Sequence, residues 1–490
     1  MPMATSWEVR PTSRSADVVT PRKSPTATAH IVRQASPPSS HPLWRDGIDS
    51  LSLPALTSDL DCDVAIIGGG FSGLWSAFHL RHFDSSLSIA VFESEEIGFG
   101  ASGRNGGWVS ADYPVDLATL ARRYPTKDVQ GFAELLAKGV DEIGEIAREI
   151  APRARFRKSG SLSFATHELQ LQRLRDAVDQ RHQLLTREET QSKVAIPSAI
   201  GGLFTENCAT VNPRGLLLDL AGYLQSRGVM IFERSFATHY DDGPPSNDGG
   251  LWVNDFRVSA RWKILAMEAF TPKSREQIPL YSLMIATRAL SSEEQAVLQW
   301  TPGLAIAEAT NNVNYAQFSA DFRIALGGRG ARYPFGGRLD QALESDTSTH
   351  RNLSAMIHEW FPQLGGSDQH SSIEITHHWG GPIAIRRNWE SRICVDHRKG
   401  LARLGGYVGD GLTMSFVAAR AVAEEIVTGE NLLAEMPIST DCSKAKKWPI
   451  EPFRYIGANA LISSIARLDE SEEAGRQSPT GRFLKRLIGK

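Results

Sequence analysis

The feature that most constrains this chain is a strand-to-helix turn near residue 70. Residues 61–83 read DCDVAIIGGGFSGLWSAFHLRHF. The apolar run before the glycines predicts a buried parallel strand, and the residues from about 72 to 82 predict a helix. Gly68, Gly70 and Gly73 fit the spacing G-x-G-x-x-G. This spacing allows a tight turn and close approach of a pyrophosphate to the backbone, so it predicts a Rossmann-like domain.

A carboxylate follows the turn at the distance that a dinucleotide site needs. The segment LSIAVFE, residues 87–93, predicts a second strand that ends at Glu93, 20 residues after Gly73. A carboxylate at that place can accept hydrogen bonds from a ribose diol. We therefore expect a dinucleotide to bind here, with Phe71 and Ser72 at the helix start among its contacts. The fingerprint does not decide between NAD and FAD, because both contain the ADP half.

Two further glycine-rich stretches favour the longer cofactor. The first, GFGASGRNGGW at 98–108, follows the second strand, and its bare backbone can run along a large ligand beside Arg104. The second, RLGGYVGDGLTMSFVAARAVAEEIVTG at 403–429, predicts a strand and then a helix over 412–428 that Gly429 ends. That helix would direct free N–H groups toward the ligand edge of the sheet. Two such stretches far apart in the sequence suit a cofactor that spans the domain, so we expect FAD.

Length and charge exclude several other classes of protein. A chain of 490 residues is long enough for two domains. The formal net charge of -3 offers no basic surface, so we expect no nucleic-acid partner. The longest apolar stretch, residues 64–80, contains four glycines and a histidine, so we expect no transmembrane segment.

The cysteines and the first residues bear on location. The four cysteines are far apart and form no C-x-x-C pair; they are Cys62, Cys208, Cys394 and Cys442. We expect neither a zinc site nor a disulfide framework. Such cysteine usage is typical of a reducing compartment, so we expect a cytoplasmic protein. Residues 1–41 are rich in Ser, Thr, Pro and Ala and predict a disordered leader, with a transit peptide as the alternative.

Six motifs occur in an order that resembles a known family. They are IIGGGFSGLWSAFHL, GFGASGRNGGW, VNPRGLLLDLAGYLQSRGVMIFE, GGRGARYPFGG, HHWGGPIAI and GGYVGDGLTMSFVAARAVAEEIVTG. Together they resemble the D-amino-acid-oxidase-type FAD-dependent oxidoreductases, and the GASGRNGG loop is most similar to that of gamma-glutamylputrescine oxidase-like members. The resemblance covers about residues 42–435. It implies bound FAD and oxidation of an amine or N-substituted amino acid to an imine, which is then hydrolysed.

The resemblance also implies which residues bind FAD. The residues that match the ADP half are Gly68, Gly70, Gly73 and Glu93, with the backbone near Ala237 at the adenine. The residues that match the phosphate-to-flavin stretch are Ser102, Arg104, Asn105, Gly106 and Gly107, and those at the flavin ring are Gly409, Gly411, Leu412 and Thr413. Much of the family has a histidine where this chain has Asp410, and no histidine or cysteine interrupts the GASGRNGG loop. We therefore expect FAD to be held without a covalent bond.

We expect an α/β fold with two interleaved domains. The two glycine sites bracket the middle of the chain, so a Rossmann-like FAD-binding domain has to be discontinuous. The rest shows helical apolar spacing first and short apolar strands later, which predicts an α+β substrate domain with a mixed sheet. The expected ranges are 60–115, 200–270 and 390–430 for the FAD-binding domain, 116–199 and 271–389 for the substrate domain, and 431–490 for a helical tail. We expect the tail to pack on the protein rather than on a membrane.

The sequence contains no motif for acid–base or nucleophilic catalysis such as G-x-S-x-G or H-E-x-x-H. A flavin amine oxidase needs none, because a neutral amine can pass a hydride from its α-carbon to flavin N5 while the protein supplies position and desolvation. Aromatic walls would favour the neutral amine. The candidates beside the motifs are Trp108, Tyr333, Trp379 and Tyr407, each equally well explained as a packed aromatic. Oxygen or another acceptor would reoxidise the flavin.

Several alternatives stay open at this point. His377 and His378 are neighbours on an expected strand and so face opposite sides, and we expect no metal site. Arg386 and Arg387 either hold a substrate carboxylate or are solvated surface charges. A flavin-binding protein without turnover and an NAD-dependent dehydrogenase are the alternative functions, and the absorption of bound flavin near ~450 nm separates the latter from a flavoprotein.

Overall fold

The computed structural model describes residues 41–240, 251–271, 275–365 and 373–476. The expected disordered leader, apart from residue 41, and the end of the expected tail lie outside the described residues. Within the described part of the chain, no helix has both the length and the hydrophobicity needed to cross a membrane.

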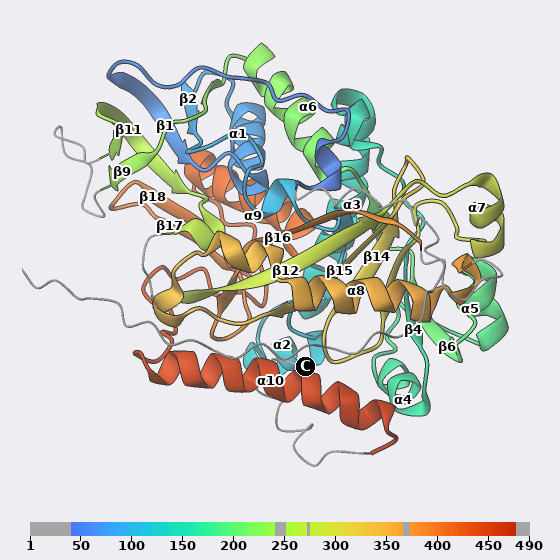
Figure 1. Ribbon diagram of the computed structural model, residues 1–490. Helices are drawn as coiled ribbons and strands as arrows, with labels where there is room; N and C mark the ends of the chain where they lie inside the picture. The colour runs from blue at the N-terminus through green and yellow to red at the C-terminus, as the bar shows by residue number, and fades with distance from the viewer. Residues whose placement is uncertain (1–40, 241–250, 272–274, 366–372, 477–490) are drawn as a thin grey trace, which may run out of the picture. The chain divides into compact units, whose positions relative to one another are not determined.

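One sheet has eight strands and a parallel centre (Figure 1). Its strands are β1 (Leu60–Ile67), β2 (Ile89–Phe92), β8 (Met230–Phe232), β9 (Ala237–Tyr240), β10 (Leu251–Val253), β11 (Phe256–Leu265), β17 (Arg392–Asp396) and β18 (Leu401–Gly405). The main order is β17-β18-β11-β1-β2-β8, in which every pair except β17 with β18 is parallel. The carboxyl ends of β1 and β2 therefore meet at one edge of the sheet, as a Rossmann-like domain requires.

Helices cover this sheet and bury its apolar residues. They are α1 (Phe71–Phe83), α3 (Val129–Ile150), α6 (Pro213–Ser226) and α9 (Gly411–Thr428), with the short α2 (Leu117–Arg123) beside α3. α1 and α9 pack against each other, and Trp75 meets Phe416 edge to face with ring centroids 5.0 Å apart. Both helices have buried residues around most of their circumference, as expected for helices enclosed by other elements.

A second eight-stranded sheet is mostly antiparallel. Its strands, in spatial order, are β16 (Ile375–Arg386), β12 (Gln277–Thr287), β15 (Ile324–Ala331), β14 (Asn314–Phe318), β13 (Ala305–Glu308), β4 (Ser161–Ala165), β6 (Gly201–Thr205) and β5 (Gln183–Leu185). Only β13 and β4 are parallel. The helix α8 (Thr347–Trp360) lies against β12 and β15, and Trp360 meets Phe164 in the core beneath it. A two-stranded ladder of β3 (Trp108–Ser110) and β7 (Cys208–Thr210) completes the sheets.

The remaining elements are short. The α-helices are α4 (Glu168–Asp176), α5 (Arg187–Lys193) and α7 (Ser292–Leu298). The 3₁₀ turns are η1 (Leu43–Arg45), η2 (Ala101–Gly103), η3 (Pro152–Ala154), η4 (Glu268–Phe270), η5 (Phe335–Gly337), η6 (Gln341–Ser345) and η7 (Pro362–Leu364).

The mixed α/β fold agrees with the fold class expected from the sequence. The strands of the first sheet fall within the three ranges expected for the FAD-binding domain. One strand inside those ranges, β6, belongs to the second sheet instead, next to β4. The domain boundaries therefore stay a prediction, and the one at residue 200 is the least supported, since the chain still pairs with the second sheet after it.

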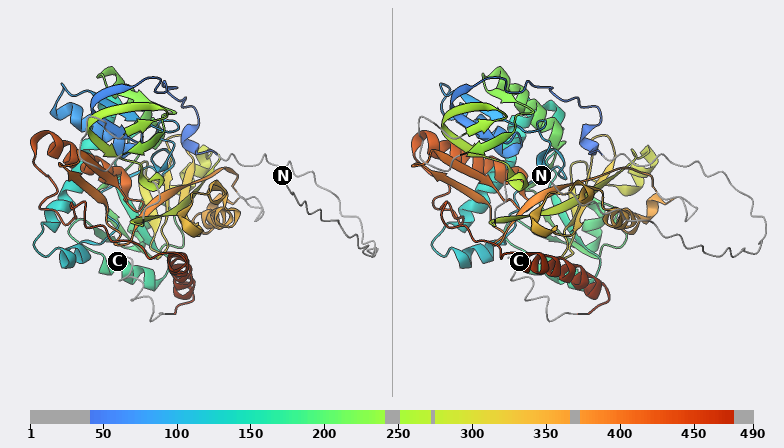
Figure 2. Two further views of the ribbon diagram at one scale, coloured as in Figure 1. Left: turned by 90° about the vertical axis from the view of Figure 1, so that its left-hand side faces the viewer. Right: turned by 60° about the vertical axis from the view of Figure 1, so that its left-hand side comes forward.

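The C-terminal tail contains one long helix, α10 (Phe453–Glu473), which lies below both sheets in the views of Figures 1 and 2. Its apolar side chains pack on the body of the protein: Ala458 is buried in the same core as α1 and α9, and Leu461, Ile462 and Ile465 pack against that core. Polar groups add to the contact, because Asp469 accepts hydrogen bonds from the backbone of Asn311 and Asn312.

The expectation that no disulfide forms is wrong. Cys394 on β17 is joined to Cys442, 48 residues later, whereas Cys62 and Cys208 are free thiols. Spacing in the sequence could not reveal the pair, because it depends on the path by which the chain returns from α9 to the edge of the first sheet. The cysteines therefore no longer support a reducing compartment.

Candidate active site

The glycine turn after β1 leaves no room for other side chains. Gly68 has φ +113°, and a Cβ on Gly73 would lie 1.9 Å from the Gly68 carbonyl oxygen. A Cβ on Gly70 would lie 2.7 Å from Ser102 Oγ, which accepts a hydrogen bond from Phe71 N at 3.0 Å. The start of α1, with no side-chain cap of its own, is thus held by Ser102 of the GASGRNGG loop.

Glu93 lies at the end of β2 and is almost fully buried beside this turn. Its Oε2 accepts a hydrogen bond from Gly69 N at 2.8 Å, and its Oε1 accepts one from Glu95 N at 3.0 Å. Burial raises the pKa of the Glu93 carboxyl above its ordinary value, although these N–H donors oppose the shift. The Glu93 carbonyl accepts from Ser235 N at 2.8 Å, which brings the chain just before Ala237 to the same edge.

The GASGRNGG loop is held together by Asn105. Its amide donates to the Ser102 carbonyl at 2.6 Å, and its Oδ1 accepts from Gly107 N at 2.8 Å. The Arg104 guanidinium donates to Glu344 at 2.6 Å and lies 4.7 Å from the centroid of the Phe99 ring. The charge expected beside the cofactor is therefore paired with a protein carboxylate.

Two tryptophans hold the same loop from outside. Trp379 Nε1 donates to the Arg104 carbonyl at 2.8 Å, and Trp44 Nε1 donates to the Asn105 carbonyl at 2.7 Å. The two indoles meet edge to face, with ring centroids 6.3 Å apart. Gln317 adds a third contact, because its amide donates to the Gly106 carbonyl at 2.7 Å. Trp44 and Gln317 were not predicted from the sequence, because they belong to no motif and reach the loop only through the tertiary fold.

The C-terminal glycine motif lies against the start of α1. The hydroxyl of Tyr407 is 2.8 Å from Ser72 Oγ, and both residues are buried. Burial raises the pKa of Tyr407 well above its ordinary value, so this hydroxyl stays protonated. Gly409 has φ +109°, and α9 begins two residues later at Gly411. The two glycine stretches expected to share one cofactor thus adjoin the same helix terminus.

Arg329 is a cation at this place that the sequence analysis did not find. It projects from β15 of the second sheet and donates from Nη2 to the Val408 carbonyl at 2.6 Å. A Cβ on Gly409 would lie 3.1 Å from the same nitrogen. Burial lowers the pKa of Arg329, and Asp410 opposes that shift. Arg329 lies in the motif GGRGARYPFGG, but the motif alone gave no reason to assign a role to this arginine.

Two buried polar atoms in the same region have no hydrogen-bond partner in the described structure. They are Trp108 Nε1 and Thr413 Oγ1. Trp108 begins β3, which lies against α9, and Thr413 is in the first turn of α9. Trp108 also meets Tyr315 edge to face at 5.7 Å, and a Cβ on Gly106 would lie 2.2 Å from that tyrosine ring. Buried polar groups are normally satisfied, so these atoms fit a site that a ligand completes.

Comparison with known proteins decides the family. The model of the DAO family, described as FAD dependent oxidoreductase, matches residues 63–425. The chain belongs to the DAO family. The gamma-glutamylputrescine oxidoreductase of Escherichia coli is 26% identical over 388 residues, which is 75% of this chain and 84% of that protein. The probable oxidoreductase OrdL of Haemophilus influenzae is 26% identical over 417 residues, 78% of this chain and 86% of that protein.

Solved structures show a similar fold. Glycine oxidase from Geobacillus kaustophilus has a TM-score of 0.62 at 18% identity, covering 78% of this chain and 99% of that one. L-proline dehydrogenase from P. horikoshii has a TM-score of 0.60 at 17% identity, covering 78% and 98%. As a DAO-family member, this protein is an FAD-dependent oxidoreductase.

The residues present fit FAD. In the turn after β1 the backbone segments lie too close together for a Cβ, and glycines occupy these positions. The buried polar atoms without a partner lie on β3 and at the start of α9, which contact each other. Gly68, Gly73 and Glu93 would hold the ADP half of the DAO cofactor, Gly106 would lie along its phosphate-to-flavin stretch, and Leu412 and Thr413 would lie at its flavin ring. These assignments are the ones that the resemblance implied, and they remain our proposal for how this DAO-family member binds FAD.

Some predicted site residues are not brought together. Tyr333 is fully buried beneath α10, where its hydroxyl donates to Glu451 at 3.0 Å. Arg386 is buried and donates to the Ser391 carbonyl at 2.9 Å, so its interpretation as a solvated surface charge is wrong. The prediction failed because Arg386 reaches back to its own turn after β16. Arg387 is exposed and donates to the Lys447 carbonyl at 3.0 Å.

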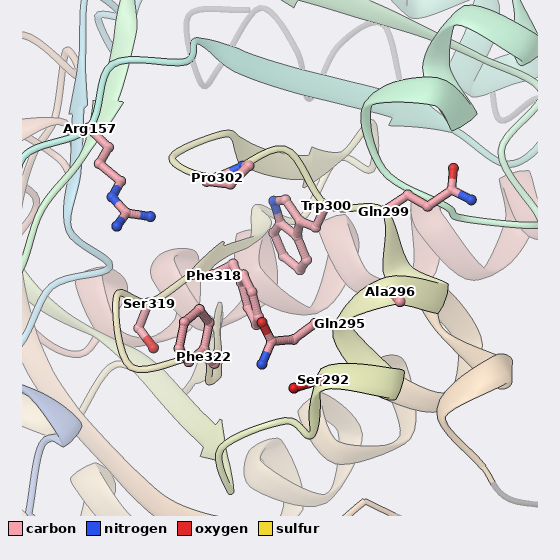
Figure 3. A pocket seen from close by; sticks show the side chains of 10 residues that line it. All are labelled: Arg157, Ser292, Gln295, Ala296, Gln299, Trp300, Pro302, Phe318, Ser319 and Phe322. Carbon is pink, nitrogen blue, oxygen red and sulfur yellow. The ribbon is translucent and has the colours of Figure 1, made fainter.

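A separate pocket of about 340 Å³ lies beside α7 (Figure 3). Trp300, Phe318 and Phe322 form its apolar side, and Arg157 and Gln295 contribute polar groups. None of the predicted DAO site residues lines it. This pocket is therefore separate from the residues predicted to bind FAD.

Proposed function

We propose that this protein oxidises an amine or an N-substituted amino acid at its C–N bond, giving an imine that water hydrolyses. The observation that carries the proposal is the pair of unpartnered buried atoms, Trp108 Nε1 and Thr413 Oγ1, on two elements that contact each other. The relatives named gamma-glutamylputrescine oxidoreductase, glycine oxidase and L-proline dehydrogenase support this substrate class, because each name denotes an amine or amino acid.

The protein groups would act by position and electrostatics. FAD, when bound, would supply the redox chemistry as the acceptor of a hydride. The N–H groups of Leu412 and Thr413 at the start of α9 stabilise negative charge near them. Trp108 and Tyr315 offer aromatic surface, and burial raises the pKa of Tyr315, so its hydroxyl stays neutral. Such surroundings favour the uncharged form of a substrate amine, which is the form able to release a hydride.

Arg329 is our candidate for recognition of a substrate carboxylate. A guanidinium has five N–H donors, and the hydrogen bond to the Val408 carbonyl uses one of them. Arginine binds carboxylates with two parallel hydrogen bonds, which gives orientation as well as affinity. This role predicts that substrates with a carboxylate react better than neutral amines of the same size.

An anaerobic screen tests the proposal. The purified yellow protein is mixed with amines, amino acids and N-methyl amino acids without oxygen, and the flavin band near ~450 nm is followed. Bleaching by one of these classes supports the proposed function. Loss of the band with dithionite but with no member of the screen favours a flavin-binding protein without turnover. Acid precipitation should also release the flavin into solution, because we propose that it is held without a covalent bond.

A further inference from the structure

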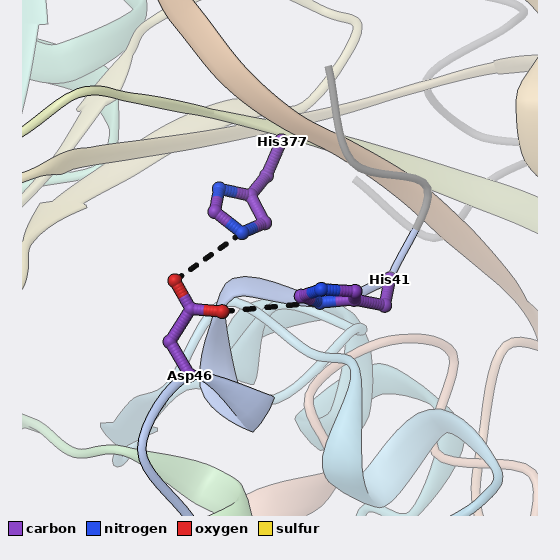
Figure 4. A group of neighbouring side chains, drawn as sticks. All are labelled: His41, Asp46 and His377. Atoms are coloured by element: carbon purple, nitrogen blue, oxygen red, sulfur yellow. Dashed lines mark ion pairs between the residues drawn. The ribbon is translucent and has the colours of Figure 1, made fainter. Parts of the chain in front are cut away.

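Three side chains that can bind a metal meet at the edge of the second sheet (Figure 4). His41 and Asp46 flank η1, and His377 comes from β16. His377 Nε2 lies 3.3 Å from Asp46 Oδ2, and His41 Nδ1 lies 4.0 Å from Asp46 Oδ1. In the described part of the chain, one donor atom from each of the three lies within 4.8 Å of the other two.

The hydrogen bonds of Thr376 indicate which nitrogen of His377 faces Asp46 as an acceptor. Thr376 Oγ1 accepts a hydrogen bond from Arg323 Nη1 at 3.0 Å, and both the Thr287 carbonyl and His377 Nδ1 lie 3.0 Å from it. When Thr376 donates to the Thr287 carbonyl, a neutral His377 ring donates to Thr376 from Nδ1. Nε2 then carries a lone pair and faces a carboxylate oxygen 3.3 Å away. In this arrangement a cation between Nε2 and Asp46 Oδ2 would satisfy both acceptors.

We propose that His41, Asp46 and His377 bind one divalent transition metal ion of the zinc type. Two imidazole nitrogens and a carboxylate are ligands that zinc accepts, and ligand atoms on tetrahedral zinc lie about 3.4 Å apart. The distance between His377 and Asp46 already fits, and the exposed His41 ring can close the remaining gap. The exposed side leaves a fourth position for water.

The nearby cation Arg323 limits the affinity of the site. Its Nη2 lies 4.0 Å from Asp46 Oδ2, while its Nε donates to Asp321 at 2.9 Å. Part of its charge is thus balanced by another carboxylate. The competing arrangement is a protonated His377 ring that pairs with Asp46 without a metal, and the experiment separates the two.

The metal would fasten the N-terminal segment to the second sheet. Between His41 and Asp46 lies Trp44, whose indole donates to the Asn105 carbonyl of the GASGRNGG loop. His41 and Asp46 therefore flank, in the sequence, the residue that contacts the loop. Metal binding would restrict the motion of this segment and stabilise the folded state by mass action.

The test is equilibrium dialysis of the untagged, FAD-loaded full chain against zinc chloride, followed by elemental analysis. We expect one zinc ion per wild-type chain. His377→Ala and Asp46→Asn should each weaken binding by more than about tenfold, and Thr376→Val, which removes the partner of Nδ1, by about tenfold to a hundredfold. Asp46 is exposed, so its variant should fold normally.

His378→Ala is the matched control. His378 is the next residue on β16 but packs on the other side, with its ring 5.0 Å from that of His350. Zinc binding by this variant should equal that of the wild type, and zinc should raise the unfolding temperature of both. The proposal is overturned if the wild type binds no zinc, if His377→Ala binds it equally well, or if His378→Ala loses it.

Discussion

The hydroxyl of Tyr407 lies 2.8 Å from Ser72 Oγ, although the two residues are 335 positions apart in the chain. Ser72 is in the first turn of α1, and Tyr407 is in the glycine-rich segment that leads into α9. Their hydrogen bond joins the G-x-G-x-x-G turn to the C-terminal glycine stretch, two segments that we expect to bind one cofactor. Segments far apart in the sequence can therefore lie at one place in the fold.

Removal of the Tyr407 hydroxyl should weaken this junction. Both partners are buried, so Tyr407→Phe leaves the Ser72 hydroxyl without its partner and should lower the free energy of unfolding by about 1–2 kcal/mol. Urea denaturation of the apoprotein measures the effect. Tyr223→Phe is the control, because the Tyr223 hydroxyl contacts Arg227 at the protein surface. Equal stability of the two variants would contradict the role assigned to Tyr407.

The close approach at Gly73 predicts a severe variant. A Cβ there would lie 1.9 Å from the Gly68 carbonyl oxygen, so Gly73→Ala must open the turn. We expect a loss of more than about 3 kcal/mol of stability and purification without flavin. At Gly222 on α6 a Cβ would meet nothing within 4 Å, so Gly222→Ala should gain about 0.5–1 kcal/mol. Absorbance at the flavin band and urea denaturation compare the two, and a yellow, stable Gly73→Ala protein would refute this account of the turn.

Local patterns in the sequence predict the first sheet and its glycine turns well. The strand, the glycine turn and the helix around Gly68 can all be recognised in 23 consecutive residues. The helix α1 begins within one residue of the position expected from them. Gly429, expected to end the last helix of the motif, is its C-cap with φ +81°. Such features are local, because glycine spacing and helix caps depend on neighbouring residues.

Features that depend on distant contacts were not predictable. Trp44 and Gln317 reach the GASGRNGG loop only after the two sheets have assembled, and neither stands in a recognisable pattern. Tyr333 lies within the motif GGRGARYPFGG but is covered by α10, whose position the sequence does not encode locally. The pairing of Cys394 with Cys442 is of the same kind.

The stability of the folded protein should depend on pH through Glu268. Its carboxylate joins β16 to the end of β18, accepting from Ala384 N at 3.2 Å and Gly406 N at 2.6 Å. Burial raises its pKa from 4.5 to about 7 despite these donors. The folded state therefore resists ionisation of Glu268 more than the unfolded state does. Its contribution to stability is complete below pH 4.5 and is lost as the pH rises through about 7.

Glu268→Gln should remove that pH dependence. Relative to this variant, the wild type should lose at most about 3 kcal/mol of unfolding free energy between pH 4.5 and pH 7. Urea denaturation at several pH values measures the difference. The substitution Glu206→Gln lies at an exposed turn position, and the free energy of unfolding of this variant should change with pH as that of the wild type does. If the free energy of unfolding of Glu268→Gln also follows that of the wild type, the Glu268 carboxyl does not titrate in this range.

Arg329 should determine the preference for charged substrates. Arg329→Met removes the proposed partner of a substrate carboxylate, so kcat/KM for the best amino-acid substrate should fall by about a hundredfold, which corresponds to roughly 3 kcal/mol. Oxidation of a neutral amine should change far less. Steady-state kinetics with the two substrates test this. Equal losses for both substrates would mean that Arg329 acts through the Val408 carbonyl and the structure of the glycine motif.

The central claim is that one FAD molecule joins the turn after β1 to the start of α9, and Thr413→Val tests it most directly. Thr413 Oγ1 is buried without a protein partner, so this near-isosteric change should not destabilise the apoprotein. Calorimetric titration of the apoprotein should show FAD binding about tenfold weaker than in the wild type, with ADP binding unchanged. Glu93→Gln should weaken both ligands. If Thr413→Val binds FAD as tightly as the wild type does, the flavin does not lie at the start of α9.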